Sequence, residues 1–214
     1  MLHVRVLCYL AVSLGALTAQ TEVQGLPPRA AAGEYQAQEK AGNVTIGADF
    51  TGHAVPTFQN PLMSEDYVAV EVAFFGAPDG KVKISFEDFS LRINGKKNAI
   101  PAQQYGMVMK SLTDPEWIPP VVEEKQKGGG ISAGGGGGGG GAAGDPKPAP
   151  PKMPFPLRRA MEQKAQKSAL PEGDRAMPIA GLVFFPYRGK DQGIQTVELI
   201  YNGAAGKATL SLRR

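Results

Sequence analysis

The residue that could do acid–base chemistry in this chain is a histidine, because the 214 residues include only two histidines and one cysteine. His53 is the one outside the N-terminal segment, so a Ser-His-Asp triad would have to use it. The candidate partners are Ser64 or Ser111 as nucleophile and Asp49 or Asp66 as acid. Neither serine lies in a Gly-x-Ser-x-Gly motif. We therefore interpret His53 as a loop residue, and a hydrolase using His53 and carboxylates is the less favoured alternative.

Metal and cofactor chemistry has little support in the residue types. The low histidine and cysteine counts exclude a Cys/His metal site with several ligands. The acidic residues are found in Glu65-Asp66, Glu87-Asp88, Glu123-Glu124, and at Asp114 and Glu116. Calcium needs six to eight converging oxygens, whereas neighbours on a strand point to opposite faces. We expect no cofactor, and we interpret the acidic residues as solvated strand ends. A calcium site in the loop at Asp114 and Glu116 is the alternative.

The glycine-rich and basic stretches do not predict a nucleotide or nucleic-acid site. Eight consecutive glycines occupy positions 134–141, but Gly-x-x-x-x-Gly-Lys-Ser/Thr is absent, so we interpret them as a spacer. The basic doublets are scattered and have no interleaved aromatics, and the formal charge is only +3. Nucleic acid is therefore not an expected partner.

The N-terminal segment has the composition of a secretory signal peptide. Met1–Ala19 carries one cation, Arg5, followed by 14 small or apolar residues, fewer than the roughly 20 that a bilayer-spanning helix requires. Cleavage after Ala19 would remove Cys8 and leave no cysteine for a disulfide. We expect an exported protein, periplasmic or extracellular, with an uncleaved N-terminal anchor as the alternative.

Hydrophobic periodicity divides the rest of the chain into four regions. Residues 20–42 are polar and small and predict a disordered leader. In Tyr67–Phe75, Val68, Val70, Val72 and Phe74 share one face, while Tyr67, Ala69, Glu71 and Ala73 share the other, which charged Glu71 marks as the solvent face. The other predicted strands lie at 44–50, 81–86, 89–93, 96–100, 179–186, 196–201 and 208–212, with turns at 77–80, Asn94-Gly95 and Asn202-Gly203. Residues 105–112 fit a strand or a helix.

The regions 43–120 and 177–214 together have the size of one Ig-like sandwich of about 100 residues and seven strands. Between them, residues 121–176 form a low-complexity Gly/Pro-rich insertion, within which 157–169 has helical spacing with a thin apolar face. We therefore predict an all-β, Ig-like antiparallel sandwich of seven to eight strands, interrupted by a disordered insertion with a short helix.

Several of these segments resemble a known group of domains. The order is Tyr67–Phe75, then Glu87-Asp88-Phe89-Ser90-Leu91, a hairpin at Asn94-Gly95-Lys96, and 180–186 (AGLVFFP) near the C-terminus. It is similar to the secreted Ig-like (telokin-like) domains of unknown function in bacterial surface proteins. The matching residues are core and turn positions, so the resemblance implies a fold and export and transfers no catalytic residue.

A loop bracketed by prolines contains the one tryptophan of the chain, Trp117, followed by Ile118. These two residues either close one end of the sandwich or contact a partner. We expect a non-catalytic binding or interaction module of the cell envelope, whose partner is an envelope protein or a glycan. The alternative is a structural accessory subunit or scaffold that uses its flexible insertion.

Overall fold

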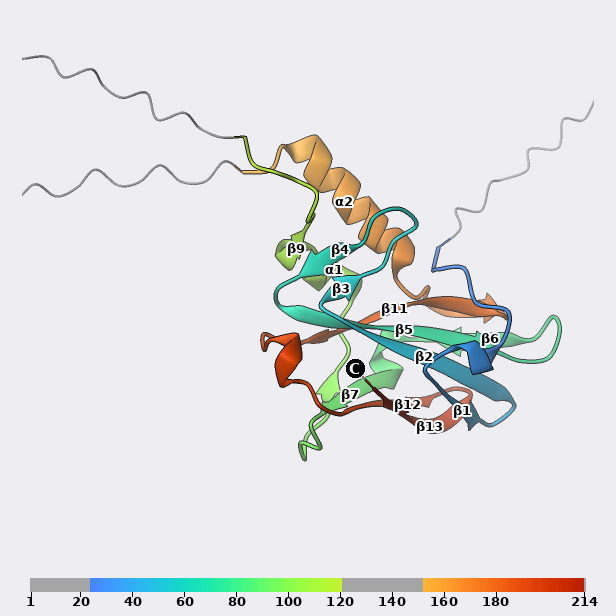
Figure 1. The fold of residues 1–214 in the computed structure, drawn as a ribbon. Helices are drawn as coiled ribbons and strands as arrows, with labels where there is room; N and C mark the ends of the chain where they lie inside the picture. Colours follow the sequence, from blue (N-terminus) through green and yellow to red (C-terminus); the bar gives the residue numbers. More distant parts are fainter. Residues whose placement is uncertain (1–23, 121–151, 214) are drawn as a thin grey trace, which may run out of the picture.

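The alternating segments of the sequence form antiparallel sheets in a computed structural model, which describes residues 24–120 and 152–213 (Figure 1). The protein is mainly β, with 44% strand in four antiparallel sheets, so the all-β prediction is confirmed at that level. The expected signal peptide and the glycine run lie outside the described residues.

Two four-stranded sheets form the body of the molecule. The first has the order β1-β2-β5-β11 and the second the order β13-β12-β7-β8. The first consists of β1 (Ala37–Ala41), β2 (Val44–Gly52), β5 (Tyr67–Phe75) and β11 (Ile179–Pro186). The second consists of β7 (Phe89–Ile93), β8 (Ile100–Pro101), β12 (Val197–Gly203) and β13 (Gly206–Leu212).

Two smaller sheets and several short helices complete the structure. One sheet pairs β6 (Lys81–Ile84) with β10 (Gly173–Ala176), and the other joins β3 (Ala54–Val55), β4 (Leu62–Ser64) and β9 (Leu112–Thr113). The α-helices are α1 (Tyr105–Val108) and α2 (Phe155–Ser168). The 3-10 helices are η1 (Ala32–Glu34), η2 (Phe86–Asp88), η3 (Met109–Ser111) and η4 (Asp191–Gly193). Neither α-helix is long and apolar enough to cross a membrane, as far as the described residues go.

The main core lies between the two four-stranded sheets. The alternating side chains of β5 that were predicted to share a face, from Val68 to Phe74, are fully buried there. Phe74 meets two aromatic rings of the opposite sheet, with ring centroids 6.2 Å from Phe89 and 5.5 Å from Tyr201. These edge-to-face contacts fix how the sheets are stacked.

The other face of β5 is also covered, which corrects the prediction that it faces solvent. Ala69 and Ala73 are buried, and the Glu71 side chain is only 14% exposed. The neighbouring strand β11 has the predicted bounds and is buried on both faces, as its continuous apolar sequence indicated. A second apolar cluster, formed by α1, α2 and the β3-β4-β9 sheet, packs on this outer face.

The helix and the strand before β11 belong to the fold, so the predicted insertion 121–176 is too long at its C-terminal side. Met161 and Ala165 of α2 are buried against the sheet, and β10 pairs with β6. The helix begins two residues earlier than predicted and ends one residue earlier. Only part of the length of the helix packs on the sheet, which agrees with its thin apolar face.

The predicted disordered leader 20–42 is also partly wrong. Residues from Ala32 onward form η1 and β1, and Tyr35 packs on the first sheet. A Cβ on Gly47 would lie 2.7 Å from the Tyr35 ring, so the glycine makes room for it. Few apolar residues suffice here because the segment adds to a sheet that already has a core.

The predicted turns are correct in two of three places. Asn94 and Gly95 have φ of 52° and 63°, as a type I′ turn requires, although the return strand is only the short β8. Asp79 also adopts a positive φ, of 60°, in its predicted turn. The last hairpin does not turn at Asn202-Gly203, because Gly203 pairs with Gly206 and the turn lies at 204–205. The ambiguous segment 105–112 is largely helical.

Replacing Phe74 tests how strongly the two sheets depend on their shared core. We expect Phe74→Ala to lower the free energy of unfolding by about 3–5 kcal/mol, because it removes contacts to both sheets and leaves a cavity. Chemical denaturation of the purified protein measures this loss. Thr209→Ala, on the exposed face of β13, is the control and should change stability by less than about 0.5 kcal/mol.

Candidate binding surface

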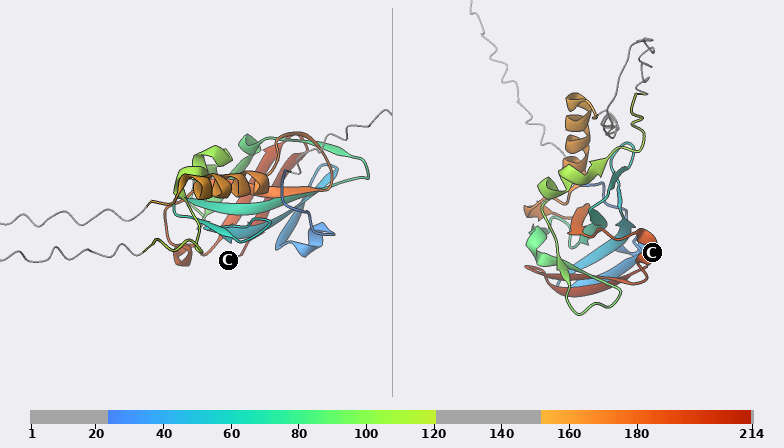
Figure 2. Two further views of the ribbon diagram at one scale, coloured as in Figure 1. Left: turned by 90° about the horizontal axis from the view of Figure 1, so that it is seen from above. Right: turned by 90° about the vertical axis from the view of Figure 1, so that its left-hand side faces the viewer.

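The covering layer on the outer face of the first sheet is the part of the protein that exposes large apolar side chains. We use this name for α1, α2, β3, β4 and β9 with the segments that connect them, which lie together on one side of β5 and β11 (Figures 1 and 2). Six large hydrophobic side chains among the described residues are exposed, and all six belong to this layer. They are Phe58, Met63, Met107, Ile118, Phe155 and Leu157.

The outer face of the second sheet carries mainly polar side chains. On the outer face of the second sheet, Arg92 and Glu198 lie on paired strands and form an ion pair of 2.7 Å. The outward residues of β13 are Lys207, Thr209 and Ser211, which are all exposed. Within residues 24–120 and 152–213, the exposed large apolar side chains are therefore confined to one side of the molecule.

Trp117 and Ile118 follow β9 on this layer. The Trp117 N–H donates to the Asp114 carbonyl at 3.1 Å, and Asn60 Nδ2 donates to Glu116 Oε2 at 2.5 Å. The second bond ties this segment to the β3–β4 loop, which carries Phe58. Trp117 is half-buried, and Ile118 is 83% exposed. The predicted contact residues thus lie on a segment that is hydrogen-bonded to the loop carrying exposed Phe58.

The N-terminal half of α2 rises away from the sheet (Figure 2). Residues 154–160 are all exposed, whereas Met161, Ala165 and Ser168 are buried. The Arg158 guanidinium lies 5.5 Å from the centre of the Phe155 ring. The helix therefore presents apolar and basic groups beyond the body of the protein.

His53 has a different acidic neighbour from those considered in the sequence. Its Nε2 lies 3.7 Å from Asp191 Oδ1, in a shallow depression of about 630 Å³. Asp49 instead pairs with Arg29, and Asp66 pairs with Arg188 at 2.9 Å. The candidate serines bond to each other, with Ser64 Oγ 2.9 Å from Ser111 Oγ. Asp191 lies 138 positions from His53 in the chain, so local spacing carried no signal for it.

The imidazole of His53 fastens the β11–β12 loop to the first sheet. Nδ1 lies 2.9 Å from the Tyr67 carbonyl oxygen, and Nε2 lies 2.7 Å from that of Gly189. Each ring nitrogen therefore faces a backbone carbonyl oxygen, one on β5 and one in the β11–β12 loop.

The acidic pairs are dispersed in the described structure. No group of three or more His, Cys, Asp or Glu side chains is arranged to hold a metal within residues 24–120 and 152–213. In the loop site considered at Asp114 and Glu116, Asp114 Oδ1 accepts from the Glu116 N–H at 2.9 Å. Burial raises the pKa of Asp88, which lies beside the β12–β13 hairpin. The pair Glu123-Glu124 lies outside the described residues.

A polar cluster that sequence reasoning missed holds the N-terminal segment over the first sheet. Arg29 forms an ion pair with Asp49, lies 4.0 Å from Glu71, and stacks 4.4 Å from the centre of the Tyr35 ring. Burial raises the pKa of Glu71, and the charge of Asp49 raises it further, while Arg29 and Tyr35 lower it. Desolvation likewise raises the pKa of Tyr35.

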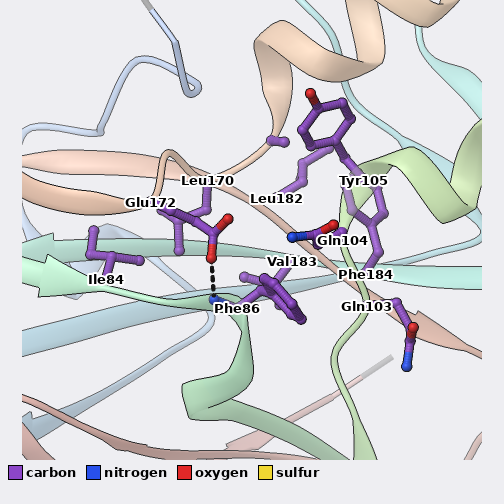
Figure 3. Close-up of a pocket in the computed structure, with 11 residues that line it drawn as sticks. Ile84, Phe86, Gln103, Gln104, Tyr105, Leu170, Glu172, Leu182, Val183 and Phe184 are labelled. Atoms are coloured by element: carbon purple, nitrogen blue, oxygen red, sulfur yellow. Dashed lines mark hydrogen bonds between the residues drawn. The ribbon is translucent and has the colours of Figure 1, made fainter.

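The most enclosed of the cavities described here lies beside β11 and is too small for an organic ligand. It has a volume of about 30 Å³ and is lined by Gln103, Gln104, Tyr105 and Glu172 among others (Figure 3). Glu172 Oε1 accepts from the Phe86 N–H at 3.2 Å at its edge. A water molecule needs about 10–15 Å³ by this measure, so the cavity suits one or two waters.

Comparisons with known proteins do not identify a family. No family model matches the chain, and no curated protein or solved structure shows significant similarity to it. The Ig-like resemblance of the sequence therefore stays a proposal.

Substitution of His53 tests its role in fastening the loop. We expect His53→Ala to lower the free energy of unfolding by about 1–2 kcal/mol, because the imidazole contacts to the Tyr67 and Gly189 carbonyl oxygens are lost. Hydrogen exchange should also become faster at the amides of Tyr187 and Gly193, whose N–H groups are bonded in the native loop. Arg188→Gln is the control, since that side chain is 83% exposed. Unchanged exchange in the loop of His53→Ala would contradict this role.

Glu71 provides a test of pH dependence with a defined sign. A pKa raised in the folded state means that protonation stabilises the fold, and that this contribution is lost as the pH rises through the folded-state pKa. We therefore expect Glu71→Gln to raise the melting temperature at neutral pH. The difference from the wild type should shrink in acid, where Glu71 itself is protonated. Thermal unfolding measured from acidic to neutral pH gives this difference in melting temperature, and Glu39→Gln, at an exposed position, is the control. A lower melting temperature for Glu71→Gln at neutral pH would contradict the prediction.

Proposed function

We propose that this protein is an exported, non-catalytic binding module of the cell envelope that binds a partner protein through the covering layer. The observation that carries the proposal is the confinement of all six exposed large hydrophobic side chains of the described structure to that layer. Apolar side chains gathered on one side of a protein, with polar residues on the other, are typical of an interaction surface.

The centre of the proposed contact is the surface formed by Phe58, Met63, Trp117 and Ile118. Two tied segments supply it, because Asn60 bonds to Glu116 and Met63 pairs with Thr113 of β9. An aromatic ring beside an exposed aliphatic side chain is the composition of many interface hot spots. Half-buried Trp117 is held in position by its turn, so little conformational entropy is lost on binding.

We further propose that the body is an Ig-like sandwich. The order β2-β5-β11 in one sheet and β13-β12-β7-β8 in the other corresponds to strands A-B-E and G-F-C-C′ of such a sandwich. In this assignment β1 is an additional edge strand, and the described residues supply no D strand to the first sheet. The resemblance to secreted Ig-like domains and the signal-peptide composition of Met1–Ala19 support export.

The scaffold alternative has one observation in its favour. The chain leaves the described structure at residue 120 and returns at residue 152, both at the α2 end of the covering layer (Figure 1). Residues 120 and 152, which the segment 121–151 joins, therefore lie on the covering layer. In this alternative the partner binds that segment rather than the folded layer.

Site-specific crosslinking in the native envelope tests the proposed surface. A photoreactive amino acid at Ile118 or Met63 should give a discrete crosslinked protein, and the same group at Thr209, on the polar face, should not. Trp117→Ala should reduce the crosslink from Ile118 about tenfold or more, the effect of losing a hot-spot residue. Equal products from Ile118 and Thr209 would refute the surface.

A deletion separates the two candidate roles. A chain without residues 121–151 should keep the crosslink from Ile118 if the folded layer binds the partner. Loss of the crosslink on deletion, with no effect of Trp117→Ala, would favour the scaffold alternative.

A further inference from the structure

The apolar stripe of α2 continues beyond the surface on which the helix packs. Leu157, Met161, Ala165 and Ser168 are spaced by four, four and three residues and therefore share one face of the helix. The last three are buried, but Leu157 is 51% exposed. Figure 2 shows the reason, since the N-terminal end of α2 stands clear of the body.

The projecting end combines apolar and basic side chains. Phe155 is 63% exposed, and the basic residues Lys152, Arg158 and Arg159 are exposed around it. Glu162 is the one acidic residue from Lys152 to Glu162, and it lies 3.9 Å from Arg158. This end of the helix is therefore positively charged as well as apolar.

The directions of the two apolar side chains distinguish a lipid surface from a protein groove. Residues two apart on an α-helix are about 200° apart around its axis, so Phe155 and Leu157 point to nearly opposite sides. A groove in a protein would cover one of them and leave the other in water. A lipid phase entered by the tip of the helix covers both. Neither of the two cavities described above is lined by this end of α2.

From these observations we infer that the projecting end of α2 binds the surface of an anionic phospholipid membrane. Phe155 and Leu157 enter the boundary between headgroups and acyl chains, as the apolar residues of interfacial helices do. Lys152, Arg158 and Arg159 contact the lipid phosphates. The inference uses none of the residues at the centre of the proposed protein contact, so the two can be tested separately.

Vesicle binding by residues 20–214 tests the inference. The probes are vesicles of phosphatidylcholine alone and of phosphatidylcholine with about 30% phosphatidylglycerol. Co-sedimentation should detect binding to the anionic vesicles, weakened at about 0.5 M salt by screening. Each basic residue is expected to contribute about fivefold to affinity, so Arg158→Gln with Arg159→Gln should weaken binding about 25-fold.

Matched variants separate this site from general charge attraction. Phe155→Ser with Leu157→Ser should weaken binding about tenfold or more, because less apolar surface enters the lipid. Lys97→Gln with Lys207→Gln removes two exposed positive charges elsewhere and should leave the affinity within about twofold. Circular dichroism checks that each variant is folded, and the substituted side chains are all exposed.

A tryptophan reporter places the contact. In a Trp117→Phe background, the tryptophan introduced by Phe155→Trp should emit at shorter wavelength on anionic vesicles. Brominated lipids should quench this emission. Absence of binding to either kind of vesicle would overturn the inference, and so would binding without a shift at position 155. If Trp117 of the native chain also shifts, lipid covers the Trp117 surface, and the proposed protein contact fails while the lipid contact stands.

Discussion

Burial of both faces of the β5–β11 strand pair is the constraint on which the rest of the structure depends. One face lies in the core against the second sheet, and the other must be covered by elements from elsewhere in the chain. Eight residue pairs join β5 to β11, although they lie about a hundred positions apart in the sequence. The N-terminal segment, the β3-β4-β9 sheet and α2 all cover the outer face. These elements lie where β5 and β11 would otherwise expose the apolar side chains of their outer face.

This constraint explains which parts of the fold could be predicted from the sequence. The bounds of Tyr67–Phe75 and 179–186 were correct because long apolar alternation and a continuous apolar run are strong local signals. The leader and the helix were misjudged because their apolar content is low, and they are ordered by packing on an existing sheet. Glu71 was placed in solvent because a charge on a strand usually marks the exposed face. Here Arg29, far away in sequence, makes its partial burial tolerable.

The candidate site was predictable only in part, for the same reason. Trp117 and Ile118 stood out by residue type, and the structure ties their segment to the loop and strand that carry exposed Phe58 and Met63. The acidic neighbour of His53 could not be foreseen, since the contact between Asp191 and His53 arises from the path of the β11–β12 loop. Side chains that meet across distant segments leave no pattern in local spacing. Residue type can suggest candidates, whereas their neighbours are decided by topology.

The covering layer differs from the sandwich in how completely it is packed. The second sheet closes the inner core mainly through β7, β12 and β13, whose inward side chains are buried while most outward ones are polar. The covering layer is built from two- and three-residue strands and short helices, which bury small patches each and leave apolar side chains at their margins. α2 shows this most directly, because its stripe passes from buried Ala165 to exposed Leu157 along one face. The covering layer buries the outer face of one strand pair but exposes apolar side chains on its own outer side. Contact with another surface would bury these side chains.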